Sequence, residues 1–289
     1  MDQSCAGAFC YLGHYYREVI KDGPRAKKCY ERAFSLDPRE GEAGLHLSDY
    51  LLDGGDTEYA VDVFRKATAA DRKANWAWKR LGFSELTGSN YLDAIGSFQK
   101  LLRNDVKDPE AWLGLAEAYQ HEGRHMASLK ALKRAQELLP DSPIVTYQIA
   151  DVYQNLTMYP EAIEYYQTTL DLSEETKEAE YMLSFMGIAQ SNLKLAREYF
   201  DLGYYGRTAE CSGNALMFAS QLLVEDGQIR AAWKLVGDAC LVYRSVPKYL
   251  HLCPLDVLCS IDSLFPADTN KSLHFPEKFD HGAIDTMRS

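Results

Sequence analysis

The sequence predicts an all-α fold, a right-handed α-solenoid built from stacked helix–turn–helix repeats. Two observations lead to this prediction. Four consecutive segments of 34 residues begin at positions 41, 75, 109 and 143 and follow one another without insertion. Large apolar and very small residues recur at the same places in every segment, which indicates one structural unit used four times.

The recurring positions fall on one face of each of two predicted helices. In the first helix a large aliphatic residue precedes a small one, as Leu47-Ser48, Leu81-Gly82, Leu115-Ala116 and Ile149-Ala150. In the second helix a small residue and a large one lie four apart, as Ala60 and Phe64, Ala94 and Phe98, Ser128 and Leu132, and Ala162 and Tyr166. Residues at such spacings share one stripe of an α-helix, so we expect the small residues to let the helices approach closely.

A period of 34 residues with this layout is typical of tetratricopeptide repeats, in which each repeat is a helix–turn–helix. Turn residues such as Gly54-Gly55 and Gly123 separate the two helices. Pro109 and Pro143 stand at the start of a first helix, where proline is favoured because its missing N–H has no partner there.

The array is predicted to extend beyond the four regular repeats and to cover residues 1–244. Its units are repeats near 6–40, 41–74, 75–108, 109–142 and 143–176, an elongated unit at 177–229 and a partial unit at 230–244. The first unit carries one extra residue, which we expect in the turn around Asp22-Gly23-Pro24. Residues 245–289 contain prolines and no periodicity, so we expect an irregular or disordered tail.

Composition indicates a soluble intracellular protein. No stretch of the 289 residues approaches the roughly 18–20 apolar residues of a membrane span, and the N-terminus begins no signal peptide. Seven cysteines without a CxxC pair favour a reducing compartment over a disulfide framework or a zinc site. The net charge of −11 argues against broad contact with nucleic acid, which needs clustered Lys and Arg. We therefore expect no membrane and no direct nucleic-acid partner.

One short run matches a zinc-peptidase motif, and its position argues against that chemistry. The run from His121 to His125 reads HEGRH, and the motif HExxH requires both histidines on one face of a continuous helix. The run falls in the predicted turn between two helices, where Gly123 interrupts the helix. No phosphate-binding loop or Ser-His-Asp arrangement accompanies it. We therefore expect no enzyme, no metal and no cofactor.

Tetratricopeptide arrays bind partners along the concave face that their first helices line. The residues expected to point there are Asp49, Phe83, Glu117 and Asp151 at position 9, with Gln120 and Gln154 at position 12. The groove is therefore predicted to be acidic with one aromatic ring. Acidic residues would repel a C-terminal carboxylate and suit a basic or mixed partner segment. A purely solubilising role for these charges is the alternative.

Some stretches go beyond a generic repeat. The runs FCYLGHYYR at 9–17 and RAKKCYERAF at 25–34 are followed by WAW at 76–78 and WKLVGDAC at 233–240. In this order they resemble the central part of the tetratricopeptide-repeat scaffold subunit of the Ski (superkiller) complex, over about residues 8 to 245.

The resemblance implies a non-catalytic scaffold. In that family the scaffold gathers an RNA helicase and WD-repeat subunits into a cytoplasmic assembly that feeds messenger RNA to the exosome for 3′-to-5′ decay. It implies those subunits as partners, the exosome indirectly, and a cytoplasmic location, with a nuclear pool as a second one. Family members are several times longer, so we interpret the chain as an internal slice, a partial gene model or a truncated form. The alternative function is a chaperone co-factor or peptide-binding adaptor that uses the acidic concave groove.

Overall fold

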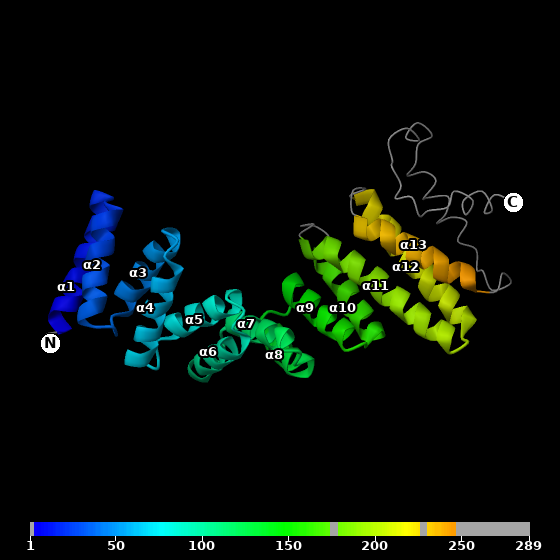
Figure 1. Cartoon of the computed structure of the whole chain (residues 1–289), viewed down its shortest axis with the longest axis horizontal. Helices are drawn as coiled ribbons and strands as arrows, with labels where there is room; N and C mark the ends of the chain where they lie inside the picture. Colours follow the sequence, from blue (N-terminus) through cyan, green and yellow to red (C-terminus); the bar gives the residue numbers. More distant parts are fainter. Residues whose placement is uncertain (1–2, 174–178, 226–229, 247–289) are drawn as a thin grey trace, which may run out of the picture. The chain divides into compact units, whose positions relative to one another are not determined.

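The computed structural model describes residues 3–173, 179–225 and 230–246, and every regular element within those ranges is a helix (Figure 1). The prediction of an all-α tetratricopeptide solenoid is confirmed. The chain forms two compact units, Met1–Leu172 and Ser173–Ser289.

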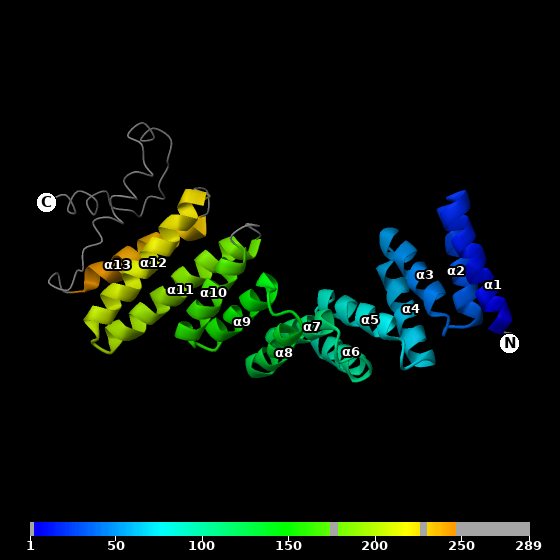
Figure 2. The same cartoon turned by 180° about the vertical axis from the view of Figure 1, so that it is seen from behind.

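The first unit consists of successive antiparallel helix pairs, which Figure 2 shows from behind. Its elements are α1 (Gln3–Tyr15), η1 (Tyr16–Ile20), α2 (Gly23–Leu36), α3 (Gly41–Asp53), α4 (Thr57–Ala70), α5 (Asn75–Thr87), α6 (Tyr91–Asn104), α7 (Pro109–His121), α8 (His125–Leu138), α9 (Pro143–Asn155) and α10 (Tyr159–Ser173). Each first helix from α3 to α9 has 13 residues. Each second helix from α2 to α8 packs against the first helix of its own repeat and against the first helix of the next repeat.

The extra residue of the first unit is not in the loop where the sequence suggested it. The end of the first helix widens instead into the π-helical turn η1, which closes with Lys21 at φ +58°. A π-helix uses i→i+5 hydrogen bonds, so it takes up one more residue per turn than an α-helix. Asp22 can therefore still cap α2, where its carboxylate accepts a hydrogen bond from the backbone N–H of Arg25 at 3.0 Å.

The turns inside the four regular repeats share one left-handed residue at the same repeat position. These residues are Gly55 (φ +79°), Ser89 (φ +59°), Gly123 (φ +70°) and Thr157 (φ +60°). Two of them are glycine, which adopts a positive φ without steric cost. Gly123 holds this place within the HEGRH run, so the run lies in an ordinary repeat turn.

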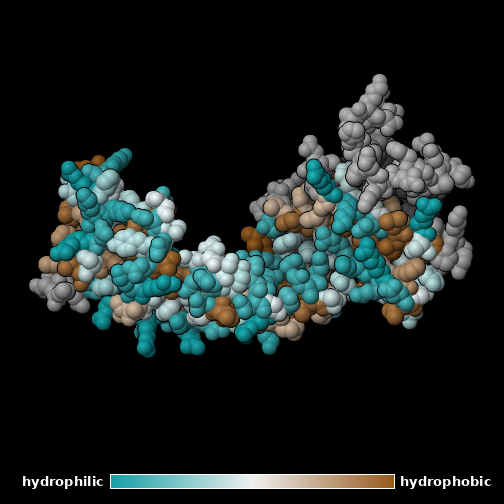
Figure 3. All heavy atoms as spheres, in the orientation of Figure 1, coloured by the Kyte–Doolittle hydropathy of each residue, from teal (hydrophilic) through white to brown (hydrophobic). Residues whose placement is uncertain are grey.

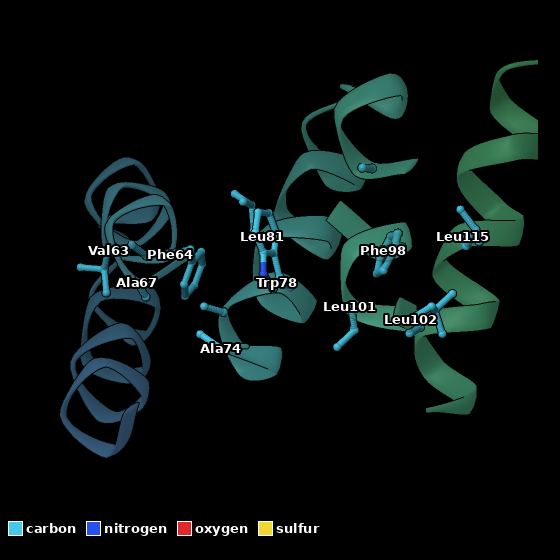
Figure 4. Packing of buried hydrophobic residues seen from close by; sticks show 14 of the residues in the cluster. Val63, Phe64, Ala67, Ala74, Trp78, Leu81, Phe98, Leu101, Leu102 and Leu115 are labelled. Carbon is cyan, nitrogen blue, oxygen red and sulfur yellow. The ribbon is translucent and has the colours of Figure 1, made fainter. Parts of the chain in front are cut away.

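The packing between repeats depends on large side chains that meet glycines. Phe98 on α6 is fully buried, and a Cβ added at Gly82 on α5 would lie 2.8 Å from its ring. A Cβ at Gly114 on α7, in the next repeat, would lie 2.4 Å from Phe98 Cζ. Figure 4 shows the row of buried side chains that runs from Phe64 past Phe98 to Leu115. One aromatic ring thus joins two repeats because both neighbours lack a side chain.

The second unit contains longer helices. They are α11 (Ala179–Asp201), α12 (Tyr205–Glu225) and α13 (Arg230–Ser245). Gly203, at φ +78°, lies in the turn that reverses the chain between α11 and α12, and α13 packs against both. Of the expected tail at 245–289, only the first two residues are described, and the rest lies outside the described residues. No helix in the described ranges is both long and apolar enough to cross a bilayer.

We expect Gly114→Ala to destabilise the first unit and Gly96→Ala to stabilise it. Overpacking of the kind a methyl at Gly114 would cause typically costs about 1–3 kcal/mol. Gly96 also lies inside a helix, but a Cβ there meets nothing within 4 Å. Alanine is favoured over glycine in such a position by roughly 0.5–1 kcal/mol. Denaturant titration followed by circular dichroism measures both, and shifts of the same sign would contradict the packing described above.

Candidate partner-binding surface

The first helices of the first unit carry a continuous row of polar and aromatic side chains, here called the first-helix face. Its members are Cys10, His14 and Arg17 near the N-terminus, Glu42, His46 and Asp49 on α3, Arg80 and Phe83 on α5, Glu117 and Gln120 on α7, and Asp151 and Gln154 on α9. Contacts between residues about one repeat apart join the N-terminal members to α3, α3 to α5, and α7 to α9. Hydrophilic side chains predominate over the first unit in the view of Figure 3.

Asp49 is neutralised within the array. Its carboxylate lies 2.6 Å from Nη2 of Arg80 in the next repeat and 3.7 Å from Nδ1 of His46. Arg80 also donates through Nη1 to Ser48 Oγ at 3.0 Å. The negative charge that the sequence predicted on this part of the face therefore already has a partner.

Asp151 is engaged as well. It accepts hydrogen bonds from Gln120 Nε2 at 3.0 Å and from Asn155 Nδ2 at 3.2 Å. Burial raises the pKa of Asp151 above its ordinary value, and the two amide donors act in the opposite direction. Gln154 in turn accepts from the buried Tyr166 hydroxyl at 3.1 Å. Four of the six predicted site residues, Asp49, Gln120, Asp151 and Gln154, thus connect different helices.

Phe83 and Glu117 form no polar contact of this kind within the described residues. The Phe83 ring packs edge-on against Phe98, with centroids 5.1 Å apart, and is 37% exposed. Within the described residues, no hydrogen bond or ion pair engages the half-buried carboxylate of Glu117. The two residues occupy the same position of α5 and α7, first helices that contact each other, and together are called the Phe83/Glu117 patch, with one apolar and one acidic group.

A cluster near the N-terminus was missed by the sequence reasoning. His14 Nε2 lies 3.6 Å from Cys10 Sγ and 3.4 Å from a carboxylate oxygen of Glu42, while His14 Nδ1 lies 3.1 Å from the Tyr30 hydroxyl. Burial raises the pKa of the Cys10 thiol to about 11, and the carboxylates of Glu40 and Glu42 add to this effect. The i, i+4 spacing of Cys10 and His14 was visible in the sequence, but their approach to Glu42 was not.

The other histidine of this region, His46, is hydrogen-bonded to Arg17. Arg17 Nη1 lies 2.6 Å from His46 Nδ1, and Nη2 of the same guanidinium donates to Glu18 at 2.8 Å. Burial, followed by the charge of Arg17, lowers the pKa of His46. The neutral imidazole can therefore accept the hydrogen bond from the guanidinium.

The two histidines of the HEGRH run belong to different helices. His121 is the last residue of α7, where its ring stacks on Tyr91 with centroids 4.4 Å apart, and His125 is the first residue of α8. A zinc-peptidase motif needs both rings one turn apart on a single helix. This pair does not have that geometry.

A second surface feature lies away from the first-helix face. A groove of about 540 Å³ between α6, α7 and α8 is lined by basic and aromatic side chains, among them Arg103, Trp112, Tyr119, Lys130 and Arg134. Trp112 Nε1 donates to the backbone carbonyl of Val106 at 2.8 Å, which fixes one wall. Arg134 is paired with Glu137 at 2.7 Å, so part of the positive charge is compensated.

Comparison with known families agrees with the repeat assignment. A tetratricopeptide-repeat family model matches residues 21–75 and 80–143, and a YpiA-like tetratricopeptide-repeat model matches residues 114–174. Among solved structures, the C-terminal part of a tetratricopeptide-repeat protein from Cytophaga hutchinsonii superposes with a TM-score of 0.58 at 18% identity, over 80% of this chain and 87% of that one. A MamA protein gives a TM-score of 0.53 at 20% identity, over 62% and 97%. At these identities the likeness shows the fold alone.

Matches to curated proteins point to a narrower group of relatives than the repeat class. The chain is 34% identical to superkiller complex protein 3 of Mus musculus and 32% identical to that of Homo sapiens, over 89% of the chain in both cases. Superkiller protein 3 of Schizosaccharomyces pombe is 32% identical over 97% of the chain. The chain spans 16% of the length of the mammalian relatives and 20% of the yeast one. The resemblance to the superkiller scaffold subunit is confirmed by these matches.

We expect Asp151→Asn to change how the stability of the first unit depends on pH. Because the folded-state pKa of Asp151 is raised, the folded chain binds this proton more tightly than the unfolded chain does. The resulting stabilisation is complete below the unfolded pKa and is lost as the pH rises through the folded pKa. Wild type should therefore gain stability relative to Asp151→Asn as the pH falls from neutral to about 4.

The difference in denaturation midpoint between the two proteins, taken across that pH range, is the measurement. Asp56→Asn is the matched control, since Asp56 is exposed in the turn between α3 and α4. A wild-type advantage that stays constant with pH, or shrinks on acidification, would show that burial of Asp151 does not govern its protonation.

Proposed function

Because the chain belongs to the tetratricopeptide-repeat family, we propose that it is a non-catalytic protein-interaction scaffold and serves as part of a superkiller complex. The observation that carries this proposal is 32–35% identity to four relatives named for that complex or for its repeats, over 85–97% of the chain. In the proposal its partners are an RNA helicase subunit and WD-repeat subunits. Its task is to support cytoplasmic, exosome-mediated 3′-to-5′ decay of messenger RNA.

In this proposal, only a few side chains of the first-helix face contact the partner protein. Asp49 and Asp151 are engaged inside the array, so their carboxylates are less available to a ligand than the sequence suggested. The Phe83/Glu117 patch offers an aromatic ring on one first helix and, on the next, a carboxylate that no described residue engages in a hydrogen bond or ion pair. Aromatic side chains contribute much of the binding energy at protein interfaces, and a carboxylate selects for positive charge. We propose that this patch contacts a partner segment with a basic and an apolar residue.

The alternative function is a chaperone co-factor or peptide-binding adaptor. A co-factor of the class that binds the C-terminal carboxylate of a partner needs unpaired positive charge on the first-helix face. Arg80 and Arg17 both lie there, but each is paired with an acidic side chain, Asp49 and Glu18 respectively. This pairing favours the scaffold over the carboxylate-binding adaptor.

Affinity purification of the tagged chain from cell lysate, followed by mass spectrometry, separates the two functions. We expect recovery of the helicase and WD-repeat subunits of a superkiller complex. Heat-shock chaperones without those subunits would overturn the scaffold proposal in favour of the adaptor.

The double variant Phe83→Ala, Glu117→Lys tests the patch within the same experiment. It should reduce recovery of the partner severalfold, because it removes the aromatic contact and places like charge opposite a basic segment. Glu58→Lys is the control, since it makes the same charge change at an exposed position of α4. Equal recovery with both variants would mean that the partner uses another surface.

A further inference from the structure

The geometry points to a metal site formed by Cys10 Sγ, His14 Nε2 and Glu42, and we propose that it binds one Zn²⁺ ion. The i, i+4 spacing of Cys10 and His14 did not by itself indicate such a site, because the carboxylate comes from the next repeat. The proposal is independent of the scaffold function. The cluster lies at the N-terminal end of the first-helix face and includes neither Phe83 nor Glu117.

Two of the three distances between the candidate ligand atoms match those of a zinc site. The Sγ–Nε2 distance is 3.6 Å, the Nε2–Oε2 distance is 3.4 Å, and all three atoms lie within 4.8 Å of one another. In a tetrahedral site with Zn–S bonds of about 2.3 Å and Zn–N and Zn–O bonds of about 2.0–2.1 Å, ligand atoms lie about 3.3–3.6 Å apart. The Cys10–His14 and His14–Glu42 pairs therefore already have the spacing of zinc ligands, and the exposed Glu42 side chain has room to adjust its distance from Cys10.

The fold supplies both rigidity and access. Cys10 and His14 lie one turn apart on one face of α1, and Glu42 lies in the first turn of α3, a helix that contacts α1. Cys10 is only 3% exposed, whereas the side chain of Glu42 is 72% exposed. The thiol thus lies at the buried end of the site, and the exposed carboxylate lies on the solvent side.

Tyr30 completes the arrangement behind the histidine. Its hydroxyl lies 3.1 Å from His14 Nδ1, so with a metal on Nε2 the Nδ1–H group would donate to the Tyr30 oxygen. Partners of this kind fix the tautomer and the orientation of a metal-bound imidazole. Tyr30 is itself fully buried, with its ring against Gly13, where an added Cβ would lie 2.6 Å from it. The packing that joins α2 to α1 therefore also holds the ligand.

The local charges favour a dication. Coordination replaces the Cys10 thiol proton, which passes to solvent, and the resulting thiolate and Glu42 carboxylate balance two positive charges. Glu40 adds negative potential close by, as its effect on Cys10 shows. The guanidinium of Arg17, whose charge acts in the opposite direction, is already engaged by Glu18 and His46. Three protein ligands leave the fourth tetrahedral position to water.

Titration of chelator-treated protein with Co²⁺ tests the site, because a cobalt–thiolate bond gives a charge-transfer band in the near ultraviolet. We expect one Co²⁺ per chain with this band, and displacement of the band by Zn²⁺. Cys10→Ala should abolish the band, and His14→Gln or Glu42→Gln should weaken Zn²⁺ affinity at least about tenfold. Tyr30→Phe should keep the band and lower affinity by about tenfold, as loss of an outer hydrogen bond does.

Cys29→Ala and His121→Gln are the matched controls, since each removes the same chemical group outside the cluster. Circular dichroism establishes that every variant is folded. Absence of a thiolate band in the folded wild type would overturn the proposal. A band that survives in Cys10→Ala or disappears in Cys29→Ala would overturn it too, because another thiol would then bind the ion.

Discussion

The structure depends on one kind of contact, a large side chain of a second helix inserted against residues that have almost no side chain. Phe98 packs between Gly82 of its own repeat and Gly114 of the next, and Tyr30 packs in the same way on Gly13. In a repeat array each unit is stabilised by its immediate neighbours, so these contacts carry much of the cooperativity. They also set the distance between successive first helices, and every polar contact across repeats requires that distance.

The polar contacts across repeats engage charged side chains that would otherwise be available to a partner. Asp49 pairs with Arg80, and Asp151 is bonded to Gln120, each across a boundary between repeats. A charge held inside the array contributes to its geometry and little to recognition. In the proposal, selectivity for a partner on the first-helix face then depends on side chains that form no such contacts, chiefly Phe83 and Glu117. A chain with a net charge of −11 can in this way present a surface that is only locally acidic.

The close packing of successive first helices also brings together the cluster around His14. Because Tyr30 fixes the imidazole and α3 brings Glu42 to it, a bound Zn²⁺ ion would link the first helices of two adjacent repeats. Such a link would strengthen one boundary of the stack by binding only the folded state. Its three ligands belong to the N-terminal end of the first-helix face, and none of them is part of the Phe83/Glu117 patch.

The sequence by itself determined the fold class and the places of the turns, because a period of 34 residues repeats the same apolar and small positions in four units. It also placed the HEGRH run in a turn, through the position of Gly123. Only the tertiary structure decided that Asp49 meets Arg80 and that Cys10 and His14 meet Glu42. Those pairs join different repeats, and their contact depends on how closely the helices pack and on where long side chains reach. The extra residue near Tyr16 shows the same limit, since a π-helical turn absorbed it where local turn signals favoured the loop.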